Sequence, residues 1–219
     1  KQDLAGLISR AVIPNKPADF VLDAANPAEG GTVEGWFRFS CALGSGVGII
    51  RLAGGLILTL LTTLSELKGH KEATGFNRPM GVMHEYKRHE DGEPHRRTAA
   101  ADPFVLIVGG GQGGLGLAAR LKVLGVPTVV IDKHPAPGDQ WRSRYAELVL
   151  HDPVWFDHMP IVPFPESWPV FTPREKMADW LKHYTSIMDL DFRGNTECVQ
   201  ATYDSAKNEW TVRLLQDGK

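Results

Sequence analysis

The stretch that decides the fold is Phe104-Val-Leu-Ile-Val-Gly-Gly-Gly-Gln-Gly-Gly-Leu-Gly-Leu-Ala-Ala-Arg-Leu-Lys-Val-Leu-Gly-Val-Pro-Thr-Val-Val-Ile-Asp132. Its pattern predicts a β-strand, a glycine turn, a helix, a second strand and an acidic residue. Gly109, Gly111 and Gly114 have the G-x-G-x-x-G spacing, in which glycines give a tight turn, close approach to a pyrophosphate and close helix–strand packing. The helix also directs its positive end at a diphosphate. We predict a dinucleotide site, with a chance glycine turn as the alternative.

Three more residues belong to this predicted site. Asp132 ends the second strand, where a carboxylate can accept hydrogen bonds from two ribose hydroxyls. Gly113 lies within the glycine turn, and Lys133 directly follows the acid. We therefore include both in the set of residues expected to bind the nucleotide.

The composition is that of an ordinary globular protein. The chain has 219 residues, more than one average domain, with 42% hydrophobic and 23% charged residues. A net charge of −2 gives no reason to expect nucleic acid or an anionic membrane as a partner. The two cysteines, Cys41 and Cys198, lie far apart, which fits a reducing compartment and excludes a C-x-x-C pair or a cysteine zinc site. We expect a cytoplasmic protein.

Both ends of the chain suggest a piece of a longer protein. The sequence begins at Lys1 without a signal-peptide pattern. It stops just after Asp217-Gly218, a hairpin turn signal with no second strand behind it. We therefore expect further functional parts outside these residues.

Residues 43–64 are apolar enough to raise the question of a membrane span. The segment carries a single charge, Arg51, and a span needs about 20 apolar residues. However, glycine pairs recur at strand-length spacing, and Arg51 would cost roughly 2.5–3.5 kcal/mol at the bilayer centre. We predict strands near residues 32–42, 47–52 and 56–67, paired as an antiparallel meander. A membrane helix is the alternative, and residues 1–31 are left unassigned.

Residues 71–102 change to a polar, charged composition that is typical of a linker. His84, His89 and His95 lie there among acidic residues, which raises the possibility of a metal site. Their spacing matches no tetrahedral ligand pattern. We therefore expect a solvated linker and no metal.

After Asp132 the chain enters a long irregular run up to Pro169, and a loop of this length within a domain is usually functional. Its aromatic residues either cover the core or form walls around a flat ring, and composition does not decide between the two. These aromatic residues are Trp141, Tyr145, Trp155, Phe156, Phe164, Trp168 and Phe171.

A helix and a hairpin are predicted after this run. Residues 172–175, Thr-Pro-Arg-Glu, have the pattern of a capping box with proline at the first helical position. Met177, Trp180, Leu181 and Tyr184 then share one helical face, which predicts a structural helix docked on the sheet. Strands are expected at residues 197–203 and 210–215.

Residues 103–219 resemble the flavin-containing monooxygenases, and YUCCA-like members in particular. The motifs that carry the resemblance are Gly109–Gly114, Asp132, Gly138-Asp-Gln-Trp141, Arg144-Tyr145, Leu150-His-Asp-Pro153 and the Pro-x-x-Pro-Phe-Pro run that follows. The family usually has Gly-Gly-x-Trp, whereas this chain has Asp139 at the second position. The N-terminal meander is similar, more weakly, to the last strands of an NTF2-like (SnoaL-like) cone.

The resemblance implies an incomplete α/β Rossmann-type FAD-binding domain at residues 103–219, after an antiparallel β-rich, NTF2-like section (α+β) at residues 1–70. It implies a FAD-dependent, NADPH-using monooxygenase that oxygenates a small organic substrate with O₂ through a C4a-hydroperoxyflavin. The NADPH site is expected outside these residues, so this piece alone should be inactive. Trp141, Arg144 and His151 are expected to border the flavin or substrate cavity, and no catalytic residue is assigned.

Two other functions stay open. One is an NAD(P)-linked dehydrogenase with a single Rossmann site and no flavin. The other is a non-catalytic role for the N-terminal section, as a ligand-binding or dimerising module, in keeping with a homo-oligomer.

Overall fold

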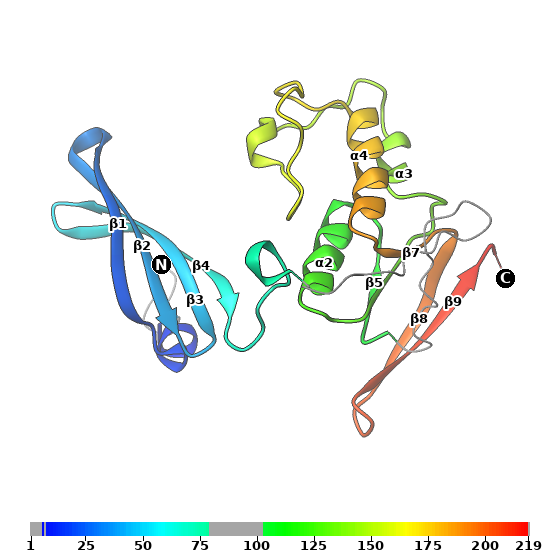
Figure 1. The fold of residues 1–219 in the computed structure, drawn as a ribbon, viewed down its shortest axis with the longest axis horizontal. Helices are drawn as coiled ribbons and strands as arrows, with labels where there is room; N and C mark the ends of the chain where they lie inside the picture. The colour runs from blue at the N-terminus through cyan, green and yellow to red at the C-terminus, as the bar shows by residue number, and fades with distance from the viewer. Residues whose placement is uncertain (1–5, 7, 79–102, 219) are drawn as a thin grey trace. The chain divides into compact units, whose positions relative to one another are not determined.

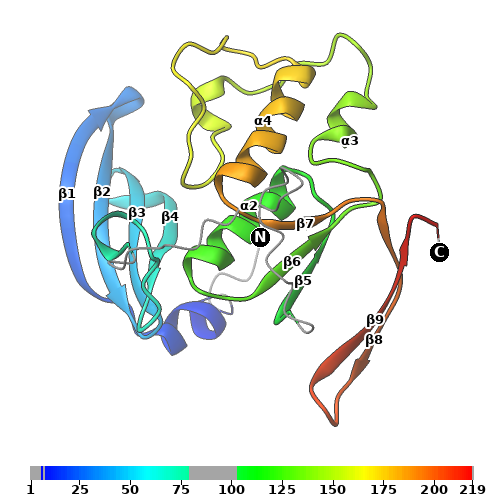
Figure 2. The same cartoon turned by 45° about the vertical axis from the view of Figure 1, so that its right-hand side comes forward.

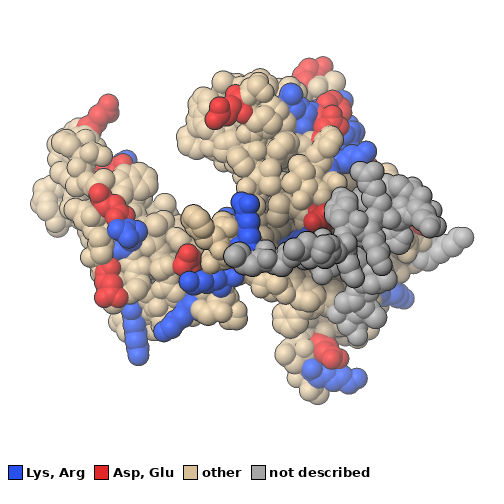
Figure 3. All heavy atoms as spheres, viewed as in Figure 1, with Lys and Arg blue, Asp and Glu red and all other residues tan. Residues whose placement is uncertain are grey.

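The computed structural model describes Gly6, residues 8–78 and residues 103–218. The chain divides into two compact units, residues 1–72 and residues 73–219. Basic and acidic residues are both present on the face of each unit that Figure 3 shows. His84, His89 and His95 lie outside the described residues.

The first unit is a four-stranded antiparallel sheet in the order β1-β2-β3-β4 (Figure 1). Short helical turns η1 (Ile8–Val12) and η2 (Ile13–Asn15) precede it, and η3 (Glu29–Gly31) joins its first two strands. The expected antiparallel meander is confirmed, and residues 43–64 contribute two strands rather than a helix. Within the described residues, no helix is both long and apolar enough to cross a membrane. The four strands are β1 (Ala18–Ala28), β2 (Thr32–Cys41), β3 (Gly44–Ala53) and β4 (Leu56–Leu67).

Strand β1 falls in the part of the sequence that we left unassigned. It contains Pro27 and pairs with β2 alone, so it is an edge strand, the place in a sheet where proline is tolerated. Phe20 on β1 contacts Phe37 and Phe39 of β2, with ring centroids 5.9 and 6.1 Å apart. These contacts with β2 stabilise β1 as a strand, although its own composition does not predict one.

The second unit is built on a parallel sheet. Strand β5 (Val105–Val108) leads through a glycine turn into helix α2 (Gln112–Val123) and then into β6 (Thr128–Ile131). Strand β7 (Asp191–Arg193) pairs with the other side of β6, so the order is β5-β6-β7 with every pair parallel. This is the strand–helix–strand arrangement predicted from residues 104–132, and it has the topology of half a Rossmann fold.

Helices and a hairpin complete this unit. Helix α2 packs on β5 and β6, and α4 (Arg174–Ile187) packs on α2 and on the short helix α3 (Asp139–Arg142). Strands β8 (Thr196–Asp204) and β9 (Glu209–Gln216) form an antiparallel hairpin that extends away from the parallel sheet (Figures 1 and 2). This confirms the hairpin expected there. Two short turns, η4 (Gly75–Asn77) and η5 (Val154–Phe156), lie in the connections.

Helix α4 brings the predicted apolar face into the core. Met177 is 2% exposed, and Leu181 and Tyr184 are fully buried. The Tyr184 hydroxyl donates a hydrogen bond to the carbonyl oxygen of Pro160 at 2.7 Å. Burial raises the pKa of Tyr184 to about 12. The helix thus fixes the irregular segment around Pro160 to the core.

The predicted capping box at the start of α4 is wrong. The N-cap residue is Pro173, no side chain caps the helix, and the Thr172 hydroxyl is buried with no partner among the described residues. Thr172 is instead held in an extended segment, where its carbonyl oxygen accepts a hydrogen bond from the Leu150 backbone at 2.9 Å. That pairing moves the helix start one residue past the position that the sequence pattern suggested.

Candidate functional site

The glycine turn joins the carboxyl end of β5 to the start of α2. Gly109 has φ 109°, a left-handed conformation that an L side chain rarely adopts, and its N–H donates to the Ile131 carbonyl at 2.8 Å. Gly111 is the N-cap of α2, and its carbonyl accepts from Leu115 N at 2.9 Å. The first backbone N–H groups of α2 therefore start at a turn that carries no side chains.

Gly114 and Gly113 differ in their surroundings. A Cβ added at Gly114 would lie 2.0 Å from the Gly109 carbonyl oxygen, so the first turn of α2 packs against the end of β5 with no room for a methyl group. A Cβ at Gly113 would meet nothing within 4 Å. Gly114 therefore serves close packing, whereas Gly113 leaves the helix start open.

Asp132 links the end of β6 to this turn. One carboxylate oxygen accepts from the Gly110 N–H at 2.6 Å, and the other accepts from the His134 N–H at 2.8 Å. Burial would raise the pKa of Asp132, but the hydrogen bonds from His134 and Gly110 outweigh it and hold the pKa below its usual value. The oxygen that accepts from the His134 N–H also lies 2.7 Å from Nδ1 of the His134 ring. The oxygen that accepts from Gly110 keeps a second lone pair, so an ionised Asp132 can still accept there from a bound hydroxyl.

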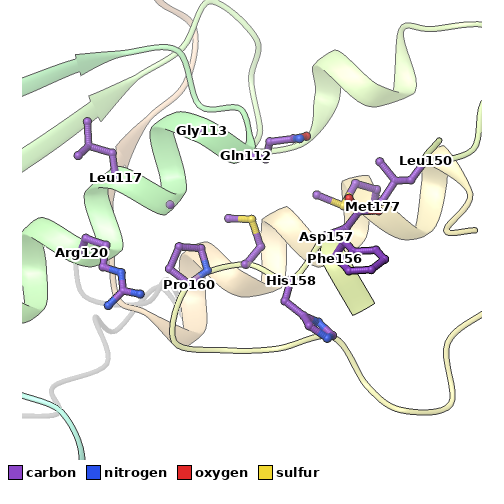
Figure 4. A pocket seen from close by; sticks show the side chains of 12 residues that line it. Gln112, Gly113, Leu117, Arg120, Leu150, Phe156, Asp157, His158, Pro160 and Met177 are labelled. Atoms are coloured by element: carbon purple, nitrogen blue, oxygen red, sulfur yellow. The ribbon is translucent and has the colours of Figure 1, made fainter. Parts of the chain in front are cut away.

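A pocket of about 480 Å³ lies beside the start of α2. One wall is the α2 face that starts at Gln112 and Gly113, and the segment around Phe156 and His158 forms the other (Figure 4). Leu150 and Met177 add apolar surface. Apolar walls with a few polar groups are typical of a site for a small organic molecule.

Four polar side chains line this pocket, Gln112 and Arg120 from α2 and Asp157 and His158 from the opposite segment. Burial, together with the nearby charge of Asp152, raises the pKa of Asp157, and one of its carboxylate oxygens is buried without a partner among the described residues. His158 accepts a hydrogen bond at Nδ1 from the Phe164 backbone N–H at 3.0 Å. A neutral His158 therefore carries its proton on Nε2. Neither Asp157 nor His158 was singled out from the sequence, because no motif marks them.

The other predicted site residues do not gather at the pocket. Trp141 is half-buried and packs against the hydrophobic core, while Lys133, Arg144 and His151 are exposed. In the described part of the chain, none of these four lines the pocket. Their roles in binding a cofactor stay predictions.

Two aromatic residues of the irregular run, Phe164 and Trp168, pack together. The rings of Phe164 and Trp168 are stacked with centroids 4.7 Å apart, and both contact Trp180 of α4 at 5.5 and 5.3 Å. These residues cover the core. Tyr145, Trp155, Phe156 and Phe171 are exposed, and Phe156 lines the pocket.

A comparison with protein-family models gives the class of fold of the second unit. Residues 107–169 match a family model described as an NAD(P)-binding Rossmann-like domain. The glycine turn, β6 and Asp132 lie within this matched region and β5 overlaps its start, whereas β7 lies outside it. The second unit thus has a Rossmann-like fold.

Particular relatives come from one group of enzymes. The chain is 34% identical over 113 residues to indole-3-pyruvate monooxygenase YUCCA1 of Oryza sativa subsp. japonica. The aligned residues cover 51% of this chain and 28% of that protein. It is 34% identical over 115 residues to the probable indole-3-pyruvate monooxygenase YUCCA9 of Arabidopsis thaliana, covering 52% of this chain and 27% of the relative. The match thus spans little more than a quarter of these relatives.

Among solved structures, a flavin-containing monooxygenase from Stenotrophomonas maltophilia matches with a TM-score of 0.47 at 24% identity. The match covers 52% of this chain and 34% of that one.

Proposed function

We propose that the second unit binds FAD within a FAD-dependent, NADPH-using monooxygenase that oxygenates a small organic substrate with O₂. The observation that carries this proposal is the open start of α2 at Gly111 with Asp132 beside it, on a parallel β-α-β unit. The similarity to plant indole-3-pyruvate monooxygenases supports the monooxygenase reaction over the others that this fold serves. Because the chain spans a small part of those relatives, the reaction is a proposal for the whole protein.

The residues present suit FAD. A diphosphate fits at the first N–H groups of α2, where Gly111 and Gly113 leave the backbone bare and the helix dipole favours negative charge. Asp132 offers a carboxylate for ribose hydroxyls. The pocket beside Gly113 has apolar walls, from Leu150 and Phe156 among others, that suit part of a flat ring. We propose that Lys133, Trp141, Arg144 and His151 contribute at the rim.

Bound FAD supplies the hydride and oxygen chemistry, and the chain supplies binding, orientation and water exclusion. Asp132 and the start of α2 fix the adenosine diphosphate half. Asp157 lies in the pocket with a raised pKa, so its carboxyl keeps a proton to a higher pH than an ordinary aspartate.

The rest of the protein is part of the same proposal. The four-stranded antiparallel sheet of the first unit supports an NTF2-like section, in which a ligand-binding or dimerising role fits a homo-oligomer. The NADPH site would be contributed by residues outside this chain segment, and the protein would be cytoplasmic.

A second candidate is an NAD(P)-linked dehydrogenase with a single Rossmann site. The description of the matched family, an NAD(P)-binding domain, favours it. The two candidates differ in the nucleotide that occupies the start of α2.

An absorbance experiment separates the two functions. We expect the purified full-length protein to show a flavin band in the visible blue that bleaches when NADPH is added without oxygen and returns when air is admitted. A colourless protein that binds NAD(P)H at the glycine turn would support the dehydrogenase instead.

Replacing Asp132 with alanine is expected to weaken FAD binding roughly tenfold or more, because a hydrogen bond to a charged group contributes about 1.5–3 kcal/mol. Fluorescence titration of the apo-protein with FAD measures the change. Glu197→Ala, which removes an exposed carboxylate on β8, is the matched control. An Asp132→Ala protein with unchanged affinity would place the ribose contact elsewhere.

A further inference from the structure

Asp132 accepts two hydrogen bonds from a single residue, His134. Its Oδ1 atom lies 2.8 Å from the backbone nitrogen of His134 and 2.7 Å from Nδ1 of the imidazole. A carboxylate only accepts, so the imidazole carries a proton on Nδ1. The backbone contact is the turn that an aspartate commonly makes with the residue two positions on. That turn does not require the imidazole contact, which therefore has a separate cause.

The loop that carries both side chains is fixed by the connection between β7 and β8. The Asp132 N–H donates to the Arg193 carbonyl at 3.1 Å, and the Asp132 carbonyl accepts from Thr196 N at 2.9 Å. The His134 carbonyl accepts from Asn195 N at 3.1 Å. The backbone of the loop is thus held by backbone hydrogen bonds, and the imidazole is left to act on the carboxylate.

The two carboxylate oxygens of Asp132 have different partners. Both donors of His134 bind Oδ1, whereas Oδ2 accepts from the Gly110 N–H at 2.6 Å. Oδ2 is therefore the oxygen at the glycine turn, where the nucleotide is proposed to bind. The side chain of Asp132 is 10% exposed and that of His134 is 29% exposed, so a ligand can reach this pair from solvent.

The charge of this pair depends on the imidazole. Asp132 is the one charged group that the described residues place within ion-pair distance of His134. With a neutral imidazole the pair carries one negative charge, and with an imidazolium its charges cancel. The charged residues on the adjoining segments are exposed or paired with one another, and they are Lys133, the Asp191–Arg193 pair at 3.4 Å and the Asp139–Arg142 pair at 3.0 Å.

We propose that His134 is a positioning residue for the adenosine ribose: its imidazole fixes Asp132 so that Oδ2 meets the ribose hydroxyls, and its protonation state sets how strongly the site rejects a ribose 2′-phosphate. This inference rests on the proposed nucleotide site and adds the residue that controls its selectivity.

Selectivity matters at this site because FAD and NADPH share an adenosine diphosphate half. The 2′-phosphate of NADPH is the difference between the two halves, so a protein that uses both nucleotides needs a group that keeps NADPH out of the FAD site. The carboxylate of Asp132 rejects the 2′-phosphate by charge repulsion. Histidine changes charge between pH 5 and 8, so an imidazolium at His134 relaxes that rejection in acid.

Two substitutions separate the N–H donor of His134 from the volume of its ring. His134→Leu removes the donor, whereas His134→Asn offers an amide N–H in place of Nδ1–H. We expect His134→Leu to weaken FAD binding by the full-length apo-protein about three- to tenfold, the range for one lost hydrogen bond, and His134→Asn to restore most of the affinity. Fluorescence titration with FAD measures the change.

The matched control is His183→Leu, which removes an exposed histidine from α4 and should leave FAD affinity unchanged. Equal weakening by His134→Leu and His134→Asn would show that the volume of the ring matters rather than its N–H, and the positioning role would be overturned.

A pH profile of selectivity is a readout that a purely structural histidine would not change. ADP-ribose and 2′-phospho-ADP-ribose differ only in the phosphate on the adenosine 2′-oxygen. Each is used to displace FAD, so that binding at a separate NADPH site is not counted. We expect the preference for ADP-ribose to fall between about pH 8 and about pH 5.5, the range in which histidine gains its charge.

His134→Asn corrects this profile for the ligand, because a phosphate monoester also loses charge on the way to pH 5.5. The preference of the unaltered protein should fall about tenfold more than that of His134→Asn, since only the unaltered protein loses the net charge of the pair. A fall of equal size in both proteins would refute the role of His134.

These outcomes are separate from the function on which the inference rests. If the full-length protein does not bind FAD, the proposed nucleotide site itself is wrong and the inference is overturned with it. If the protein binds FAD and both His134 variants bind it with unchanged affinity, the nucleotide site stands and the positioning role of His134 is refuted.

Discussion

Replacing Gly111 with valine is expected to abolish stoichiometric FAD binding while leaving the fold intact. Gly111 has φ −79°, which any residue adopts, and the nearest atom to an added Cβ is the end of the flexible Gln140 side chain. The protein can therefore accept the side chain, whereas a diphosphate at the start of α2 cannot approach past it. FAD titration, with circular dichroism to monitor the fold, measures both parts.

The size of the side chain at this position provides a graded control. Gly111→Ala should reduce FAD affinity less than Gly111→Val, because only a methyl group enters the space. Full flavin occupancy in the folded valine variant would show that the diphosphate does not lie at this turn.

Replacing Gly114 with alanine is expected to lower the free energy of unfolding by about 1–3 kcal/mol, the usual cost of forcing extra volume into a packed site. The added Cβ would lie 2.0 Å from the Gly109 carbonyl oxygen and 3.2 Å from the Ile107 side chain. Since the first of these atoms is backbone, α2 must move away from β5. Urea unfolding followed by circular dichroism gives the magnitude.

Gly113→Ala is the matched control for stability. It lies one residue earlier on the same helix, and its Cβ would enter open space. Alanine is a better helix former than glycine by about 1 kcal/mol, so this variant should be as stable as the original protein or more so. Equal destabilisation by both substitutions would contradict the packing role assigned to Gly114.

The parallel part of the fold could be predicted because its signals are local. A strand, a glycine turn and a helix follow one another within residues 104–132, and each glycine has its own steric reason. The apolar spacing of α4 is equally local, and Met177, Leu181 and Tyr184 are buried as expected. The antiparallel meander was predictable because glycine turns separate its strands.

The parts that were not predicted depend on contacts between distant segments. Strand β1 is held by β2 and by aromatic contacts across the sheet, which residues 18–28 do not encode by themselves. Thr172 pairs with the backbone of Leu150 instead of capping α4, because an extended pairing competes with the local capping pattern.

In the candidate site too, some residues could be predicted from a local motif and others depend on contacts between distant segments. The glycines and Asp132 follow from a spacing rule, and the structure brings them together at the carboxyl ends of β5 and β6. Asp157 and His158 have no motif, and they reach the pocket only because the irregular run folds back over α2. Sequence reasoning expected a functional role for that run, which stays a prediction, and chose other residues within it.

The measurement that tests the central claim most directly is a titration of nucleotide-free protein with FAD, followed by displacement with ADP. If the start of α2 holds a flavin dinucleotide, FAD should bind stoichiometrically, ADP should displace it, and Gly111→Val should bind neither. FAD binding that persists in Gly111→Val, or a failure of the unaltered protein to bind FAD, would contradict this account.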